Sequence, residues 1–402
     1  MYKNIITYFK IIILSIILSI YLFQTYLTLK YSGTSGELAK KINIYKKNTG
    51  YEFEKRTKFE LYNDLKKDDE NIVVTITPSF NLEYFNKQYL TENLFPLSGI
   101  SNIKTINCNE NGYYSIYLSD RYGFNNPDNE WDKNEIEYFL VGDSFTHGNC
   151  VNRPNDIGSH LRRLSSKHVL NLGYAANGPL FQYATIREYL QQNVKNVIWL
   201  YSENDLHNLE RDVVSQALLK YLNDENFSQS LKTKQKKIDI YLNKLIDDIY
   251  ALEGPKQLEE KIEKNSLFYK IEKFITLKNI RDLFLKKYFS TYNINEKINP
   301  LFEEILKKSK KISEKNGSNF YFVFLPSFER YGANYDSDEI EYNQIKNINE
   351  KLGIPFIDIH YDLFLKEKNK LVFFPFEVNG HYNIEGYKKV SEIIYKKTSI
   401  KH

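Results

Sequence analysis

An almost unbroken apolar run lies near the start of the chain. Between Ile11 and Leu29 its only polar side chains are uncharged. About 20 consecutive apolar residues are enough for a helix to span a bilayer. The run exceeds the apolar core of a secretory signal peptide, and no small-residue cleavage site follows it. We therefore predict an uncleaved signal anchor at residues 1–30, in preference to a cleaved signal or to a buried helix of a soluble protein.

The charges beside this run bear on its orientation. Lys3 and Lys10 precede it, and four lysines follow between residues 40 and 47. A short tail before the run and a large domain after it favour an inside N-terminus. We therefore expect a single-pass membrane protein with its main domain on the extracytoplasmic, periplasmic side. In that oxidising setting Cys108 and Cys150 could form a disulfide, the alternative being two unrelated thiols.

Short, continuous apolar runs alternate with helical patterns through much of the remaining chain. Such runs are typical of parallel strands buried on both faces. Strands are predicted at 72–77, 113–118, 138–141, 168–172, 197–201, 320–325 and 354–359, and helices at 180–192, 301–315 and 384–396. The alternation predicts an α/β fold with a parallel sheet covered on both faces.

One long region breaks this alternation. From about residue 209 apolar positions recur at helical spacing, and no strand signal interrupts them. Gly254-Pro255 is expected to end the helix that contains Ile238 and Ile249. We interpret the region as a helical insertion whose role is packing rather than capping a site. The predicted organisation is an anchor at 1–30, a membrane-proximal segment with accessory strands at 31–134, a core at 135–208 and 301–402, and the insertion at 209–300.

Composition narrows the function only slightly. Charged residues make up 26% of the 402 residues and the net charge is +4. Lysines mostly alternate with acidic residues, whereas a nucleic-acid binder usually shows a concentrated basic stripe. We expect no nucleic-acid partner. The chain contains neither a Walker-type phosphate loop nor an H-E-x-x-H motif, so no metal or organic cofactor is implied.

A candidate nucleophile follows the strand at 138–141. Gly142-Asp143-Ser144 stands where that strand ends, and ligands of open α/β sheets bind beyond the carboxyl ends of the strands. The alternative is that Asp143 or Ser144 only caps the next helix. His147, three residues further on, is expected to lie on a helix surface.

Three more residues follow strands or precede helices in the same way. Gly173 ends the next strand, Asn204 lies just past the third, and His381 precedes the last helix. In a parallel sheet these positions belong to one edge. The sequence therefore predicts that serine, glycine, asparagine and histidine meet there.

This series resembles the SGNH/GDSL hydrolase family, whose four blocks supply these residues in this order. The blocks are G-D-S-F-T-H-G, N-L-G, E-N-D-L and G-H-Y-N here. The resemblance covers roughly residues 136–206 and 319–398, and it implies a three-layer, flavodoxin-like sheet. It also implies that Ser144 is the nucleophile and His381 the base. The oxyanion donors would be the Ser144 and Gly173 backbones and the Asn204 amide.

The sequence departs from the family around the histidine. The family usually places an aspartate two or three residues before it, where this chain has Val378 and Asn379. Glu377 is the nearest preceding carboxylate. The site could therefore be a dyad, an Asn379-assisted triad or a triad that uses Glu377. Glu203, beside the asparagine of the third block, could narrow the substrate pocket.

The resemblance and the anchor together predict a serine ester hydrolase or O-acyltransferase. We expect O-acyl groups, such as acetyl groups, on envelope carbohydrate as the substrate, and the membrane as a partner. One alternative is a lipid esterase or thioesterase. Another is a catalytically weakened relative that binds glycan or scaffolds envelope assembly, because the usual aspartate is missing.

Overall fold

The computed structural model describes residues 2–31, 33–80, 82, 94–265, 267–278, 280–281, 298–332 and 338–399. The chain divides into two compact units. One comprises Met1–Phe53 with Ile249–Glu296, and the other Glu54–Asp248 with Lys297–His402.

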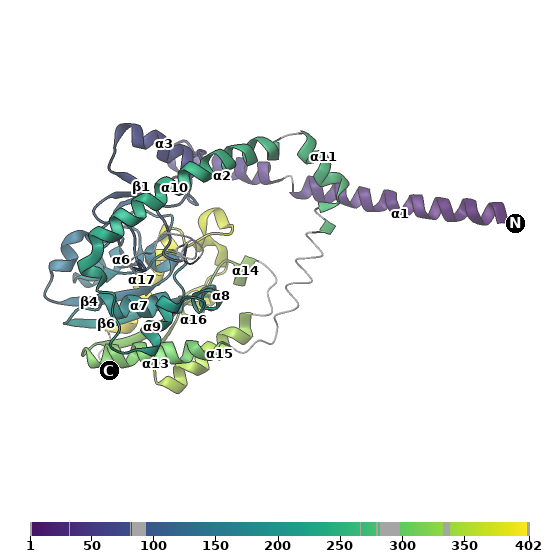
Figure 1. Ribbon diagram of the computed structural model, residues 1–402. Coiled ribbons are helices and arrows are strands. Elements are labelled where there is room, and N and C mark those ends of the chain that lie inside the picture. The colour runs from purple at the N-terminus through teal and green to yellow at the C-terminus, as the bar shows by residue number, and fades with distance from the viewer. Residues whose placement is uncertain are drawn as a thin grey trace. The chain divides into compact units, whose positions relative to one another are not determined.

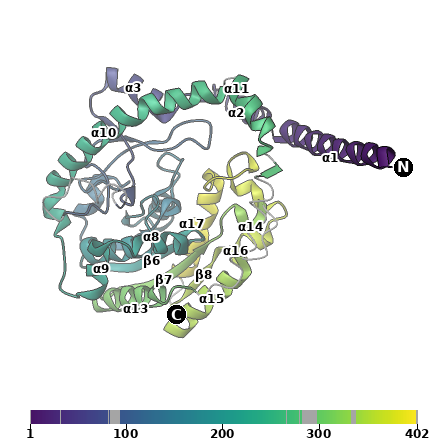
Figure 2. The same ribbon diagram turned by 45° about the vertical axis from the view of Figure 1, so that its right-hand side comes forward.

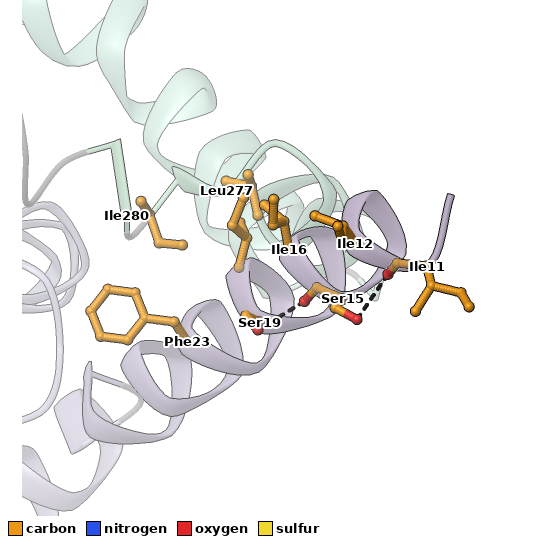
Figure 3. Close-up of a pocket in the computed structure, with 9 residues that line it drawn as sticks. Ile11, Ile12, Ser15, Ile16, Ser19, Phe23, Leu277 and Ile280 are labelled. Carbon is orange, nitrogen blue, oxygen red and sulfur yellow. Dashed lines mark hydrogen bonds between the residues drawn. The ribbon is translucent and has the colours of Figure 1, made fainter. Parts of the chain in front are cut away.

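The first unit is helical. It contains α1 (Tyr2–Tyr31), α2 (Gly33–Thr49), α11 (Leu267–Ile275) and the end of α10 (Leu231–Asn265). Figure 1 shows α1 as one long helix at the N-terminus. Within it, Asn4–Thr28 is long and apolar enough to cross a membrane. Figure 3 shows an apolar hollow between α1 and Leu277 and Ile280. The hydroxyls of the serines in this part of α1 bond to carbonyls four residues earlier, so the helix presents little unsatisfied polarity.

The second unit contains a five-stranded parallel sheet. Its strands are β4 (Ile136–Gly142), β5 (Val169–Asn171), β6 (Val194–Ser202), β7 (Asn319–Leu325) and β8 (Phe356–Asp358). Their order is β5-β4-β6-β7-β8, and every neighbouring pair is parallel. Figure 2 shows β6, β7 and β8 side by side. The chain leaves β4 in one direction and returns on its other side as β6, so a topological switch point lies between these two strands.

Helices cover both faces of this sheet. Alternate strand residues such as Tyr138 and Leu140 pack in one cluster with α6 (Ile157–Ser165) and α17 (Ile384–Ser399). The other strand residues face the opposite side of the sheet, where Tyr201 of β6 packs on Phe302 of α13. That second layer consists of α7 (Pro179–Tyr189), α8 (Asp205–Asp212), α9 (Gln216–Asn223) and α13 (Pro300–Lys315). The predicted three-layer α/β fold is confirmed.

A small accessory sheet precedes the main one. It consists of β1 (Ile72–Val74), β2 (Lys104–Ile106) and β3 (Ile116–Leu118). β1 pairs with β2 in parallel, and β2 pairs with β3 antiparallel. Helix α3 (Lys58–Asp68) packs on β1 and begins with a capping box. Residues 107–115, between β2 and β3, contain Glu110, and we call this segment the acid loop.

The remaining elements are short or connect the strands. They are α5 (Ser144–His147), α14 (Glu329–Gly332), α15 (Asp338–Leu352), α16 (Ile359–Asp362), and the 3-10 helices η1 (Asp128–Asp132), η2 (Phe364–Lys366), η3 (Lys370–Phe373) and η4 (Pro375–Glu377).

One expectation about secondary structure was wrong, and one strand was missed. Helix α10 continues through Gly254-Pro255 instead of ending there. A proline inside a helix costs one backbone hydrogen bond, and here the surrounding helix continues despite that loss. Strand β2 was missed, because Lys104–Ile106 ends in a single apolar residue and gives no apolar run. Part of the predicted insertion at 209–300 lies outside the described residues.

Candidate active site

Ser144 stands at the switch point of the sheet. It is the first residue of α5, directly after β4, and the Asp143 side chain caps the helix by accepting from Phe145 N. A side chain on Gly142 would place its Cβ 2.0 Å from Thr146 Oγ1, so only glycine fits this turn. The tight turn therefore presents the serine at the carboxyl end of β4.

His381 reaches this serine from the other end of the chain. Its Nε2 lies 2.8 Å from Ser144 Oγ, which is hydrogen-bonding distance. Its Nδ1 lies 2.9 Å from Glu110 Oε1, and its backbone N–H donates to Glu110 Oε2 at 2.6 Å. The serine hydroxyl, the imidazole and a carboxylate thus form one continuous chain of hydrogen bonds.

The carboxylate comes from the acid loop, not from the residues expected beside the histidine. Asn379 is exposed and donates to Glu329 at 2.9 Å, and Glu377 is exposed within η4. Glu110 lies 271 positions from His381 in the sequence. We found no sequence signal for it, because one glutamate in a polar turn resembles any solvated residue.

Gly380 makes room for this carboxylate. A Cβ at position 380 would lie 2.8 Å from Glu110 Oε2, the oxygen that accepts from the next residue's backbone N–H. A larger residue would push the carboxylate away from His381. The glycine before the histidine in the last block therefore has a local steric role.

The surroundings of His381 favour its protonated form. Burial by itself lowers the pKa of the ring, but the hydrogen bond and negative charge of Glu110 outweigh it. Asp143 and Glu329 add further negative charge, and the pKa of His381 is raised above its usual value. A ring with a raised pKa takes up a proton from serine more readily.

Asp143 and Ser202 continue the polar network beyond the nucleophile. Asp143 Oδ2 lies 3.2 Å from Ser144 Oγ and accepts from Ser202 Oγ at 2.7 Å. Ser202 Oγ also contacts Asn204 Oδ1. Asn204 is exposed at the start of α8.

Gly173 packs tightly against the helix that carries the serine. A Cβ at this position would lie 2.4 Å from Thr146 Cβ and 2.5 Å from His147 N. Its N–H donates to Asn171 Oδ1 at 3.0 Å. The need for glycine at this position thus comes from the neighbouring helix α5.

We expect Gly173→Ala to lower the free energy of unfolding by about 1–3 kcal/mol, because the added methyl group overpacks a buried contact. Urea unfolding followed by circular dichroism measures this loss. Gly317→Ala is the reference for backbone strain without overpacking, because a Cβ there meets nothing within 4 Å but its φ of +80° is unfavourable for alanine. A smaller loss at 173 than at 317 would contradict the overpacking.

Two other polar residues have structural roles. His147 was expected on a helix surface, which was wrong: the ring is fully buried, and burial lowers its pKa to about 4. Glu203 was considered as a wall of the substrate pocket. Its carboxylate forms an ion pair with Arg330, whose side chain is nearly buried, and accepts from Ser327 N at 2.7 Å.

Cys108 and Cys150 form a disulfide, with their Cα atoms 4.8 Å apart. Ligand atoms of Glu110, Cys150 and His381 lie within 4.8 Å of one another. This group is a poor metal site, because a sulfur in a disulfide is not the thiolate that binds metal ions.

Among known proteins, the chain is similar to solved structures only. No family model matches the chain, and no curated protein matches it. A protein from Desulfitobacterium hafniense DCB-2 assigned to the lipolytic G-D-S-L family is 14% identical, with a TM-score of 0.36, and the match covers 65% of this chain and 99% of that one.

Two further structures are similar to a comparable degree. A member of the lipolytic G-D-S-L family from Veillonella parvula DSM 2008 is 11% identical, with a TM-score of 0.36, over 66% of this chain and 98% of that one. Protein YXIM from Bacillus subtilis is 12% identical, with a TM-score of 0.33, over 66% of this chain and 57% of that one. Two of these three solved structures are of proteins assigned to the lipolytic G-D-S-L family.

Proposed function

We propose that this protein is a serine ester hydrolase or O-acyltransferase that works through an acyl-enzyme on Ser144. The observation that supports this most directly is the hydrogen-bonded series Ser144 Oγ, His381 Nε2, His381 Nδ1 and Glu110 Oε1, with distances of 2.8 and 2.9 Å. A serine becomes a useful nucleophile when a positioned base takes its proton and a third group orients that base.

The first half of the reaction forms the acyl-enzyme. His381 Nε2 takes the proton from Ser144 Oγ while the oxygen attacks the ester carbonyl carbon. Glu110 stabilises the resulting imidazolium. When the tetrahedral intermediate collapses, the ring gives that proton to the leaving alcohol. The acyl group then remains as an ester on Ser144.

The second half releases the acyl group. A water molecule or a sugar hydroxyl gives its proton to His381 and attacks the ester carbonyl. Collapse of this second intermediate returns the proton to Ser144 Oγ. Attack by water makes the protein an esterase, and attack by a sugar makes it an acyltransferase, so both reactions use the same residues.

The negative oxygen of each intermediate needs hydrogen-bond donors. We assign the Ser144 backbone N–H and the Asn204 amide N–H to this role, each contributing about 3 kcal/mol. The Gly173 N–H is the third donor that the family resemblance implies. It is bonded to Asn171 Oδ1 and would have to exchange that partner for the substrate oxygen.

We further propose that the substrate is O-acylated carbohydrate of the cell envelope, handled on the extracytoplasmic side. Two features support the extracytoplasmic location. Residues Asn4–Thr28 of α1 are long and apolar enough to span a membrane. The disulfide between Cys108 and Cys150 is typical of proteins in oxidising compartments.

A fluorophosphonate probe tests the proposal, because it reacts only with an activated serine. Full-length protein in detergent should be labelled, Ser144→Ala should not be, and Ser327→Ala should be labelled like the wild type. An unlabelled wild type would contradict the assignment. Mass spectrometry of O-acetylated envelope glycans incubated with the protein then tests the substrate, with the loss or transfer of an acetyl group as the expected result.

A further inference from the structure

The disulfide joins the acid loop, which carries Glu110, to the segment that follows Ser144 and α5. Cys108 lies two residues before Glu110 in the acid loop, and Cys150 lies six residues after Ser144. The sequence separation of the two cysteines is 42 residues. Cys150 is fully buried in the second unit. A single covalent cross-link thus connects the loop of the acid to the loop that follows the nucleophile.

Hydrogen bonds also connect the two segments that this disulfide joins. Asn111 Nδ2 donates to Cys150 O at 2.9 Å, and Asn107 Nδ2 donates to Asn149 Oδ1 at 3.0 Å. The acid loop is also closed on itself, since Ser115 N donates to Cys108 O at 2.9 Å. Individual hydrogen bonds contribute little net stability, because water competes for the same groups.

The acid loop belongs to the accessory sheet and reaches the active site only through side chains. Glu110 is partly exposed and meets His381 with both carboxylate oxygens. Keeping two such bonds requires that the loop backbone stay close to the segment around residue 380. A small displacement of the loop would break the geometry, and misplacement of about 1 Å can cost about 100-fold in rate.

We propose that the Cys108–Cys150 disulfide is the positioning element that holds the Glu110 carboxylate on His381, so that full activity requires the oxidised cross-link. This inference rests on the proposed function of Ser144, His381 and Glu110. Reduction by a dithiol transfers two electrons and two protons, leaves thiols on Cys108 and Cys150, and converts the reductant to its own disulfide. The side-chain hydrogen bonds from Asn111 to Cys150 O and from Asn107 to Asn149 then remain between the acid loop and the segment after Ser144.

The first test observes His381 directly and does not depend on catalysis. The charged and titratable groups around the ring are Glu110, Asp143, Glu329 and His147. Only Glu110 is carried by the acid loop. We therefore expect the pKa of His381 to fall when dithiothreitol reduces the disulfide in the full-length protein in detergent.

NMR of the protein with isotope-labelled histidine measures this pKa, and the resonance is assigned by its loss in His381→Gln. The Glu110→Gln variant should show the same lowered pKa with and without dithiothreitol. An identical His381 pKa in oxidised and reduced wild type would overturn the proposal.

The second test separates positioning from general stabilisation. Reduction should lower the rate of fluorophosphonate labelling of the wild type by about 100-fold, and the Cys108→Ala/Cys150→Ala variant should be equally slow in either condition. In Glu110→Gln, reduction should cause no further loss. A further loss there, or a collapse of the far-ultraviolet circular dichroism on reduction, would overturn a positioning role. Absence of Ser144-dependent labelling in the oxidised protein would reject the proposed function instead, and the NMR titration would still decide the role of the disulfide.

Discussion

Replacing His381 with alanine is expected to lower kcat by about 10⁶-fold, because a serine that loses its base is left with only substrate binding and the oxyanion donors. His381 lies at hydrogen-bonding distance from Ser144 Oγ, and its side chain is partly exposed. Truncation therefore leaves no large cavity in the core, and the fold should persist. Hydrolysis of p-nitrophenyl acetate measures the loss, and circular dichroism checks the fold.

His207→Ala is the matched control for this substitution. His207 is an almost fully exposed histidine on α8, and its loss should leave turnover near the wild-type value. Turnover of His381→Ala within about tenfold of the wild type would reject the assignment of His381 as the base.

Replacing Glu110 with glutamine is expected to lower kcat by about 10⁴-fold. The glutamine keeps the size of the side chain but removes the charge that stabilises the imidazolium. Its amide can also present the wrong group to His381 Nδ1. The matched controls are Glu377→Gln and Asn379→Ala, which change the two residues expected from the sequence, and both should remain close to the wild type. If Glu377→Gln or Asn379→Ala were the more damaging change, the role of Glu110 would be refuted.

The pH dependence of Glu110→Gln provides an independent check. His381 accepts the serine proton only when the ring is neutral, so kcat/KM should rise as the pH rises through the pKa of His381. That pKa is raised: burial alone would lower it, but Glu110 outweighs burial. Without the Glu110 charge the pKa falls, and the acidic limb of the profile should move to lower pH. An unmoved limb would show that Glu110 does not control the ring.

The sequence predicted those features that are encoded locally. Each core strand is a short run of apolar residues, and burial on both faces explains why polar residues are absent from it. The Gly142-Asp143-Ser144 turn and the Gly380-His381 pair can be recognised because each occupies a strand end or helix start. Their side chains meet because the carboxyl ends of parallel strands share one edge of the sheet.

The tertiary structure decided what depends on contacts between distant segments. Glu110, in a polar loop of the accessory sheet, meets His381 only because that loop folds against the edge of the main sheet. The same applies to the partnership of Asn379 with Glu329, which removes Asn379 from the role expected of it. The spacing of residues in the sequence does not predict such pairs. The polar residues that form them are also common at solvent-exposed positions, where they have no specific partner.

The sequence by itself therefore determined the α/β core, the apolar N-terminal helix, the serine and the histidine. Only the folded chain selected the carboxylate and joined Cys108 to Cys150. The physical reason is that hydrophobic periodicity acts over neighbouring residues. Hydrogen bonds and a disulfide, by contrast, require short distances that only the packing of whole elements establishes.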